Sequence, residues 1–470
     1  MQRALNAIAD TNFVSEVPRY RTHDEIGRAF RRLATLYPNS VDLRIIGHSL
    51  EGKEIYCLEM GNKNSGKKVL WVANAHGEEM RGTEEILHII RALLSNDFLR
   101  EVFLQKFHFT VVPTINPDAR EFNLRWAKDE INLQEYFLTA RRTIADQNGI
   151  EADMEWGYPL SLDEERVMRR PEAAALRALM DEERFCLYLD LHGALNVCDL
   201  GFWFLVGSGK HNREQTIEFL HLAGLQTGLP LIEREKMENN LCLKLKPGVH
   251  TLCTAKEMLK KYGKEPRVVD WFKKERGASS FDYMMLQNPE GQGFVAELPT
   301  FYHERYMDMT PSGRRRVDVE RRRLENALRR CREVIIPLLD QTLQISQHPI
   351  LQKCRSDIDA ISIPYMQSDL TRLEEEHGAS VATLGEIREL EELFEYWGCP
   401  GYGRFGVGGV ISRLPKEEIE KLAGIYQLCK EKAEQCAEKV KMLGLRELSF
   451  TDSVNIQART CLGLILTYFS

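Results

Sequence analysis

Apolar runs alternate with helix-forming stretches over residues 22–298, and this alternation constrains the fold more than any other feature of the sequence. The runs at 67–73 and 107–113 are typical of buried strands, whereas 83–95 and 171–180 have the residue spacing of helices. Strands that alternate with helices favour a sheet with parallel strands, covered by helices on its faces. The sequence therefore predicts an α/β fold for this region.

Local signals mark the ends of several of these elements. Residues 22–36 are predicted to form an amphipathic helix, in which Thr22 is the N-cap and Glu25 completes a capping box. Two strand candidates follow at 41–46 and 55–60, on either side of a turn. Later in the chain, strands are predicted at 185–191, 202–206 and 293–298, and a helix at 213–227.

The composition is that of a globular protein, and it excludes some partners. Hydrophobic residues make up 43% and charged residues 28% of the chain, and the formal net charge is −7. An acidic chain gives no electrostatic reason to expect binding to nucleic acid or to an anionic membrane. No apolar run approaches the roughly 20 residues that a helix needs to cross a bilayer. The first twenty or so residues lack the pattern of a signal peptide, so we expect a cytoplasmic location.

The chain is too long for one ordinary domain, because it has 470 residues. We expect a large catalytic domain over residues 1–347. After residue 347 the sequence changes, and 370–397 and 416–443 are charged and helix-prone, with apolar positions three and four residues apart. Residues 348–470 are therefore predicted to form a helix-rich accessory domain. The oligomeric state stays open.

Polar residues follow the predicted strands. His76 and Glu79 come after one strand, and Asn116, His192 and Glu297 lie at or near the ends of three others. In α/β folds, sites gather where strands end. A His-x-x-Glu at such a corner can direct a nitrogen and an oxygen at one point, as zinc requires.

His192 has two interpretations when it is taken alone. A histidine at the end of an apolar strand can be an ordinary core residue, or it can be a metal ligand. If it binds a metal through one ring nitrogen, a carboxylate or carbonyl should hold the other nitrogen, and Asp190 is two residues away.

Glu297 also has two interpretations. It lies in the run Phe294-Val295-Ala296-Glu297-Leu298-Pro299, so it is either a solvent-facing residue on an edge strand or a partly buried carboxylate. Partial burial would raise its pKa and suit it to act as a general base toward a metal-bound water.

Taken together, these motifs resemble the zinc carboxypeptidases of the M14 type. The resemblance is carried, in order, by His76-x-x-Glu79, Asn116-Pro117-Asp118, His192 and Glu297-Leu298-Pro299, and it extends over about residues 19–337. It implies a mixed eight-stranded sheet sandwiched by helices. It also implies one zinc ion per chain, held by His76, Glu79 and His192, with an open position for water.

The same resemblance implies roles for further residues. Glu297 would be the general base, and Arg125 would help to stabilise the oxyanion, unless it is a surface arginine on a polar loop. Residues 277–282 resemble the Gly-Ser-x-Asp stretch of the family. Phe281 in that stretch is either part of a substrate pocket or a core residue.

The sequence departs from the family where the substrate carboxylate is usually bound. Members carry Gly-x-Asp-x-Asn-Arg-Asn, whereas this chain has Met154 in the arginine position, between Asp153 and Glu155. Methionine cannot make the bidentate contact of a guanidinium with a carboxylate. Arg141 or Arg142 could bind the carboxylate instead, or Asp153 and its acidic neighbours could bind an amine of the substrate, unless they are plain loop residues.

Three functions remain open from the sequence. The first is a carboxypeptidase with altered specificity toward peptides. The second is an amidase or deacylase that acts on a small amide, since the same zinc site serves both reactions. The third is a non-enzymatic binding protein that keeps the fold.

Overall fold

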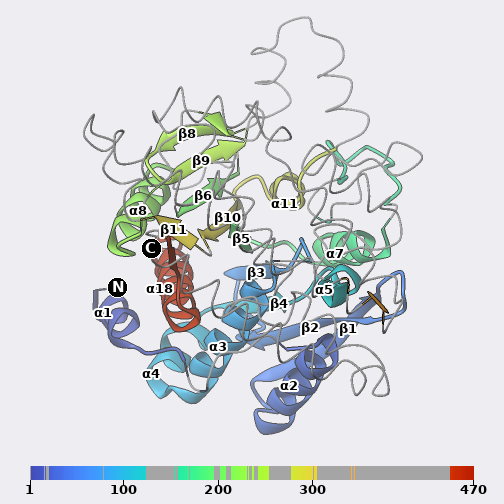
Figure 1. The fold of residues 1–470 in the computed structure, drawn as a ribbon, viewed down its shortest axis with the longest axis horizontal. Helices are drawn as coiled ribbons and strands as arrows, with labels where there is room; N and C mark the ends of the chain where they lie inside the picture. Colours follow the sequence, from blue (N-terminus) through green and yellow to red (C-terminus); the bar gives the residue numbers. More distant parts are fainter. Residues whose placement is uncertain are drawn as a thin grey trace, which may run out of the picture.

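The computed structural model describes the strands and helices that surround the predicted site. The described residues are 2–14, 16, 21–77, 79–122, 154, 157–168, 170–194, 202–207, 213–229, 231, 236–237, 242–252, 277–299, 301–303, 340, 343–344 and 445–470. A sheet runs through the middle of this part of the chain, and helices lie on both of its faces (Figure 1).

The sheet has ten strands within the described residues. Their order is β1-β2-β4-β3-β5-β10-β6-β9-β8-β7. The strands are β1 Val41–His48, β2 Glu54–Gly61, β3 Lys68–Ala73, β4 His108–Val112, β5 Leu187–Ala194, β6 Trp203–Val206, β7 Lys236–Met237, β8 Cys242–Lys246, β9 Val249–Leu252 and β10 Gln292–Pro299.

The centre of the sheet is parallel and its margins are mixed. Strands β4, β3, β5 and β10 run parallel to one another, whereas β2 pairs antiparallel with β4, and β6 pairs antiparallel with β10. The predicted mixed sheet between helices is confirmed, with ten strands in the described residues where the resemblance implied eight. Because the central strands are parallel, their carboxyl ends meet at one edge of the sheet.

Four of the described helices, α2, α3, α7 and α8, begin and end close to predicted bounds, whereas the others were not predicted. The described helices are α1 Gln2–Asp10, α2 His23–Leu36, α3 Arg81–Ser95, α4 Asp97–Leu99 with the π-helical turn η1 Arg100–Leu104, α5 Pro117–Phe122, α7 Pro171–Glu182, α8 Arg213–Gln226, α11 Ser280–Gln287 and α18 Phe450–Tyr468. The predicted capping box is confirmed, because the Thr22 hydroxyl accepts from the Glu25 amide at 3.1 Å and the Glu25 carboxylate accepts from the Thr22 amide at 2.7 Å.

Two layers of apolar side chains lie on the two faces of the sheet. One layer joins the sheet to α1, α2, α3 and α18, and the other joins it to α7 and α11. Phe281 belongs to the second layer and is completely buried. A Cβ atom added at Gly293 would lie 2.6 Å from the Phe281 Cβ, so the glycine allows α11 to pack closely on β10.

The last helix, α18, packs into the first of these layers. It contacts α3 and α8, and its buried residues include Leu462 and Ile465. The strand β12, Leu445–Glu447, pairs with β11, Phe301–His303, which follows β10 directly. Residues 445–470 thus share a core with the β-sheet and α3. The division of the chain at residue 347 stays a prediction, because residues 348–444 lie outside the described residues.

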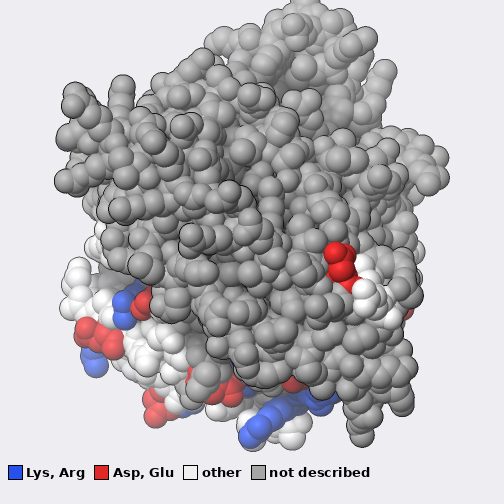
Figure 2. Space-filling model, in the orientation of Figure 1, with Lys and Arg blue, Asp and Glu red and all other residues white. Residues whose placement is uncertain are grey.

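The surface of the described residues mixes both signs of charge. On the face drawn in Figure 2, both basic and acidic side chains are visible among the described residues. Among the described helices, none combines the length and the apolar character needed to cross a membrane.

We predict that α18 and α3 unfold in one transition. Leu462 on α18 and Leu93 on α3 are both fully buried in the same apolar layer. Replacing either by alanine should lower the free energy of unfolding by about 2–5 kcal/mol. Denaturant unfolding should show both substitutions shifting the same cooperative transition. A Leu462→Ala variant that shifts a separate transition would place α18 in an independent domain.

Candidate metal centre

The predicted site residues lie at the carboxyl edge of the parallel strands. His76 follows β3, Asn116 follows β4, His192 lies near the end of β5, and Glu297 lies near the end of β10. Strands β5 and β10 are paired so that Glu297 is the partner of His192. Paired residues on neighbouring strands point to the same face of a sheet, so these two side chains lie side by side.

A short loop, residues 74–80, connects β3 to α3 and carries two of the predicted ligands. We call it the metal loop; residue 78 within it lies outside the described residues. Asn74 opens the loop in the left-handed conformation, with φ at 60°, which asparagine tolerates better than most residues. The Asn74 amide donates to the carbonyl oxygens of His76 at 2.6 Å and Gly77 at 3.1 Å. Asn116 donates to the Ala75 carbonyl at 3.1 Å.

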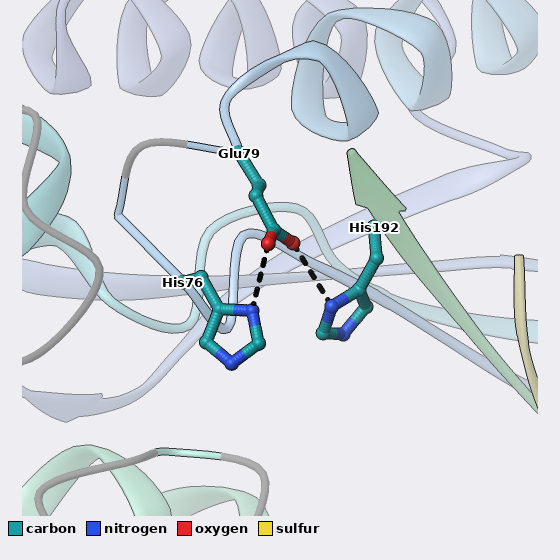
Figure 3. Close-up of side chains that lie close together, drawn as sticks. All are labelled: His76, Glu79 and His192. Carbon is teal, nitrogen blue, oxygen red and sulfur yellow. Dashed lines mark hydrogen bonds and ion pairs between the residues drawn. The ribbon is translucent and has the colours of Figure 1, made fainter. Parts of the chain in front are cut away.

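The Glu79 carboxylate lies between two histidines, as Figure 3 shows. Its Oε1 is 3.0 Å from His76 Nδ1, and its Oε2 is 2.9 Å from His192 Nδ1. All three side chains are buried. Within the described residues, His76, Glu79 and His192 form the one group whose potential ligand atoms all lie within 4.8 Å of one another.

The donor set of this group fits zinc. Two imidazole nitrogens and a carboxylate oxygen are ligands that zinc uses in proteins, and three protein ligands leave a fourth position open, as catalytic zinc sites require. The three donors come from two elements that are fixed by the sheet, the metal loop after β3 and the end of β5. The residues therefore agree with the zinc site that the resemblance implied.

A chain of polar groups supports His192 from behind. Asp190 Oδ1 lies 3.4 Å from His192 Nε2, the nitrogen that faces away from Glu79. Asp190 Oδ2 accepts from the Tyr188 hydroxyl at 3.2 Å, and that hydroxyl lies 2.9 Å from the hydroxyl of Ser280 on α11. Such a carboxylate fixes the orientation of a ligating histidine. Asp190 therefore lies where the sequence predicts a partner for the second ring nitrogen of His192.

The charges of the centre stabilise one another. Burial alone would raise the pKa of Glu79, but the neighbouring His76 and His192 lower it well below the usual value. Burial alone would lower the pKa of His192, but Asp190 and Glu79 raise it well above the usual value. Glu79 is therefore ionised and ready to bind a cation, and a metal that binds His192 displaces a proton from it.

Glu297 lies next to the candidate metal ligands but is not a member of the group His76, Glu79 and His192. Its Oε1 is 3.8 Å from His192 Nδ1, and its side chain is 14% exposed, whereas the ligands are almost completely buried. On its other side, Trp203 of β6 is its antiparallel partner. Glu297 therefore lies beside the candidate ligands and is more exposed than any of them.

The remaining predicted site residues lie elsewhere. Arg125, Arg141, Arg142 and Asp153 are outside the described residues, so their roles stay predictions. Phe281 lies in the apolar core, which is the alternative to a substrate pocket that the sequence left open.

Met154, in the position of the family's clamp arginine, is also buried in the apolar layer beneath α7 and α11. Its carbonyl accepts a hydrogen bond from the Tyr158 hydroxyl at 3.3 Å. The side chain at this position therefore packs as a core residue.

Sequence reasoning missed the residues that hold the loops around the site. Asp118 accepts from the Ser49 hydroxyl at 2.7 Å and from the Glu51 amide at 2.9 Å, which fixes the turn between β1 and β2. Asn74 and Arg120 were not singled out at all. An asparagine directly after a buried strand was the available signal for Asn74, because asparagine is enriched in the left-handed conformation.

Comparison with known proteins agrees with the geometry. Residues 26–203 match the sequence profile of the zinc carboxypeptidase family, peptidase M14. This part of the chain is thus similar to a zinc carboxypeptidase domain. It contains the β3–α3 corner with two of the candidate ligands and the β5 strand with the third.

Similarity to individual proteins is distant and partial. Carboxypeptidase D from Drosophila melanogaster is 26% identical over 198 residues, 39% of this chain and 13% of that protein. Carboxypeptidase M from Mus musculus is 24% identical over 194 residues, 39% of this chain and 41% of that protein. The matches thus span less than half the length of these relatives.

Two further matches complete the comparison. An inactive metallocarboxypeptidase from Ajellomyces dermatitidis is 26% identical over 202 residues, 37% of this chain and 33% of that protein. Among solved structures, carboxypeptidase A from Helicoverpa armigera aligns at 16% identity with a TM-score of 0.39, over 64% of this chain and 70% of that chain.

We predict that zinc binding depends on both the ligands and Asp190. The purified protein should hold about one zinc ion per chain, and His76→Ala should abolish this binding. Asp190→Ala should weaken zinc binding by about 10–100-fold, because His192 loses the group that orients it. Asp190→Asn should lose less, since an amide oxygen still accepts from the ring. Metal analysis and competition with a chelator measure both effects. A pure protein that takes up no zinc would contradict the assignment.

Proposed function

We propose that this protein is a zinc-dependent hydrolase of the M14 type that cleaves an amide bond in a peptide or peptide-like substrate. The observation that carries the proposal is the meeting of His76, Glu79 and His192 at one buried point, with the Glu297 carboxylate 3.8 Å from His192. These are the ligands and the base that such a reaction needs, and they come from three parts of one sheet edge: the metal loop, β5 and β10.

The proposed mechanism assigns each residue one task. When bound, zinc would polarise the substrate carbonyl and lower the pKa of a water molecule. Glu297 accepts the proton of the attacking water and passes it to the leaving amine, acting first as base and then as acid. His76, Glu79 and His192 hold the cation, and Asp190 keeps His192 in the orientation that presents Nδ1. Arg125 would stabilise the oxyanion.

The substrate is the part of the proposal that departs from the family. Met154 occupies the arginine position of the usual carboxylate clamp and is buried in the core. Recognition of a free carboxylate therefore needs another cation, for which Arg141 or Arg142 are the candidates. The acidic residues around Asp153 instead favour a substrate that carries an amine. We infer a carboxypeptidase with altered specificity as the first version, and an amidase or deacylase on small amides as the second.

A non-enzymatic binding protein is a second candidate function. It is favoured by one relative described as an inactive metallocarboxypeptidase. Against it, the potential ligand atoms of His76, Glu79 and His192 lie within 4.8 Å of one another, and Glu297 Oε1 lies 3.8 Å from His192 Nδ1. Loss of catalysis removes the constraint on these residues, so their joint presence supports an enzyme.

The role of Glu297 can be tested by a substitution that replaces one carboxylate oxygen with an amide nitrogen. Glu297→Gln removes the base but keeps the size of the side chain, so zinc content should be unchanged while turnover falls by roughly two orders of magnitude or more. Hydrolysis rates and zinc content should be measured on the same preparation. Near-normal turnover would remove Glu297 from the mechanism.

Matched peptides distinguish the two versions of the activity. Each peptide is offered once with a free C-terminal carboxylate and once with a C-terminal amide. If Arg141 or Arg142 serves as the clamp, the free acid should be preferred, and replacing both arginines by methionine should raise KM for the acid alone. An equal or greater rate with the amidated peptide would favour the amidase version, and strict preference for the acid would exclude it.

A further inference from the structure

We propose that Arg120 and Asn74 are positioning residues that hold the metal loop in the shape required for metal binding. The inference rests on the proposed zinc site but concerns residues that are not ligands. Neither residue touches the point where His76, Glu79 and His192 meet. Asn74, the first residue of the metal loop, is completely buried, and Arg120, which contacts the loop from α5, is almost completely buried.

Arg120 spans the two ends of the metal loop. Its Nη1 donates to Asn74 Oδ1 at 3.4 Å, at the start of the loop, and to the Met80 carbonyl at 3.3 Å, at its end. The same nitrogen lies 3.2 Å from the hydroxyl of Thr83 in the first turn of α3. One guanidinium thus fixes the distance between the end of β3 and the start of α3.

Asn74 transmits this support to the ligands. Its side-chain oxygen accepts from Arg120, while its side-chain nitrogen donates to the carbonyls of His76 and Gly77. Two backbone carbonyls next to a ligand are therefore tied to a group that Arg120 holds. The left-handed conformation of Asn74 directs its amide back over the loop.

The buried charge of Arg120 is compensated within the same layer. Glu84 on α3 is fully buried, and its Oε1 lies 3.1 Å from Arg120 Nη2. Arg21 also binds Glu84, through its guanidinium and through its backbone amide at 2.7 Å. Arg120 Nη2 in turn donates to the Arg21 carbonyl at 3.2 Å. The second arginine keeps Glu84 paired if Arg120 is lost.

Because Glu84 has two arginine partners, a positioning role of Arg120 can be distinguished from a contribution to stability alone. Replacing one member of a buried ionic group by an apolar residue strongly destabilises the fold when the remaining charge has no partner. In Arg120→Met, the Glu84 carboxylate still forms an ion pair with Arg21. The metal loop, in contrast, loses the hydrogen bonds that Arg120 donates to it. The expected defect is therefore in metal binding and ligand geometry, beyond the loss of stability.

The test compares four variants for zinc affinity, by competition with a chelator, and for the visible spectrum of the cobalt(II)-loaded protein. Arg120→Met and Asn74→Gly should each weaken zinc binding by about 10–100-fold and change the cobalt spectrum. Glycine keeps the left-handed backbone and removes only the amide. Arg120→Lys should restore part of the affinity. The double variant should bind no more weakly than the weaker single one, because the two residues act as a unit.

The matched control is Arg170→Met. Arg170 is another almost fully buried arginine, at the start of α7 and outside the metal loop. This control should lose stability without weakening zinc binding. Equal loss of affinity in the control, or folded Arg120→Met and Asn74→Gly variants that bind zinc as the unchanged protein does, would overturn the proposal. If Arg120→Met does not fold, Asn74→Gly decides alone. Absence of zinc binding in the unchanged protein would instead contradict the proposed function.

Discussion

Parallel pairing of β3, β5 and β10 is the constraint on which the site depends. It brings the end of β3, which leads into the metal loop, next to His192 on β5, and it makes Glu297 the partner of His192. A shift of one residue in either pairing would turn these side chains to the opposite face, because side chains alternate along a strand. The ligand geometry is thus a consequence of sheet register, which the two apolar layers hold in place.

Burial gives the centre its chemistry. Glu79 between two imidazoles stays ionised despite being almost inaccessible to water, because the histidines offset the cost of desolvation. Outside this group, charge is paired again at Asp190 behind His192 and at Glu84 behind the metal loop. Glu297 is less buried than the three candidate ligands, because 14% of its side chain is exposed.

His76 and Glu79 could be predicted as a pair from the sequence because their signal is local, whereas His192 joined them only through the resemblance to the family. The apolar run before His76-x-x-Glu79 indicates a buried strand, and the polar motif marks where that strand ends. The capping box at Thr22 is an equally local signal, for the start of a helix. Long-range pairings left no such signal. Arg120 binds Glu84, 36 residues away, and α18 returns to pack beside α3 although it lies near the end of the chain. The charge composition cannot show which arginine is buried. The periodicity of a helix cannot show which other element its apolar face will pack against.

The central claim is that His76, Glu79 and His192 bind one zinc ion and leave a position open. Diffraction data collected on either side of the zinc absorption edge test it most directly. The account predicts a single anomalous peak at about 2.0–2.2 Å from Nδ1 of both histidines and from a carboxylate oxygen of Glu79, with a water molecule as the remaining ligand. A zinc-loaded crystal with its anomalous peak on other residues, or with no peak at this point, would contradict it.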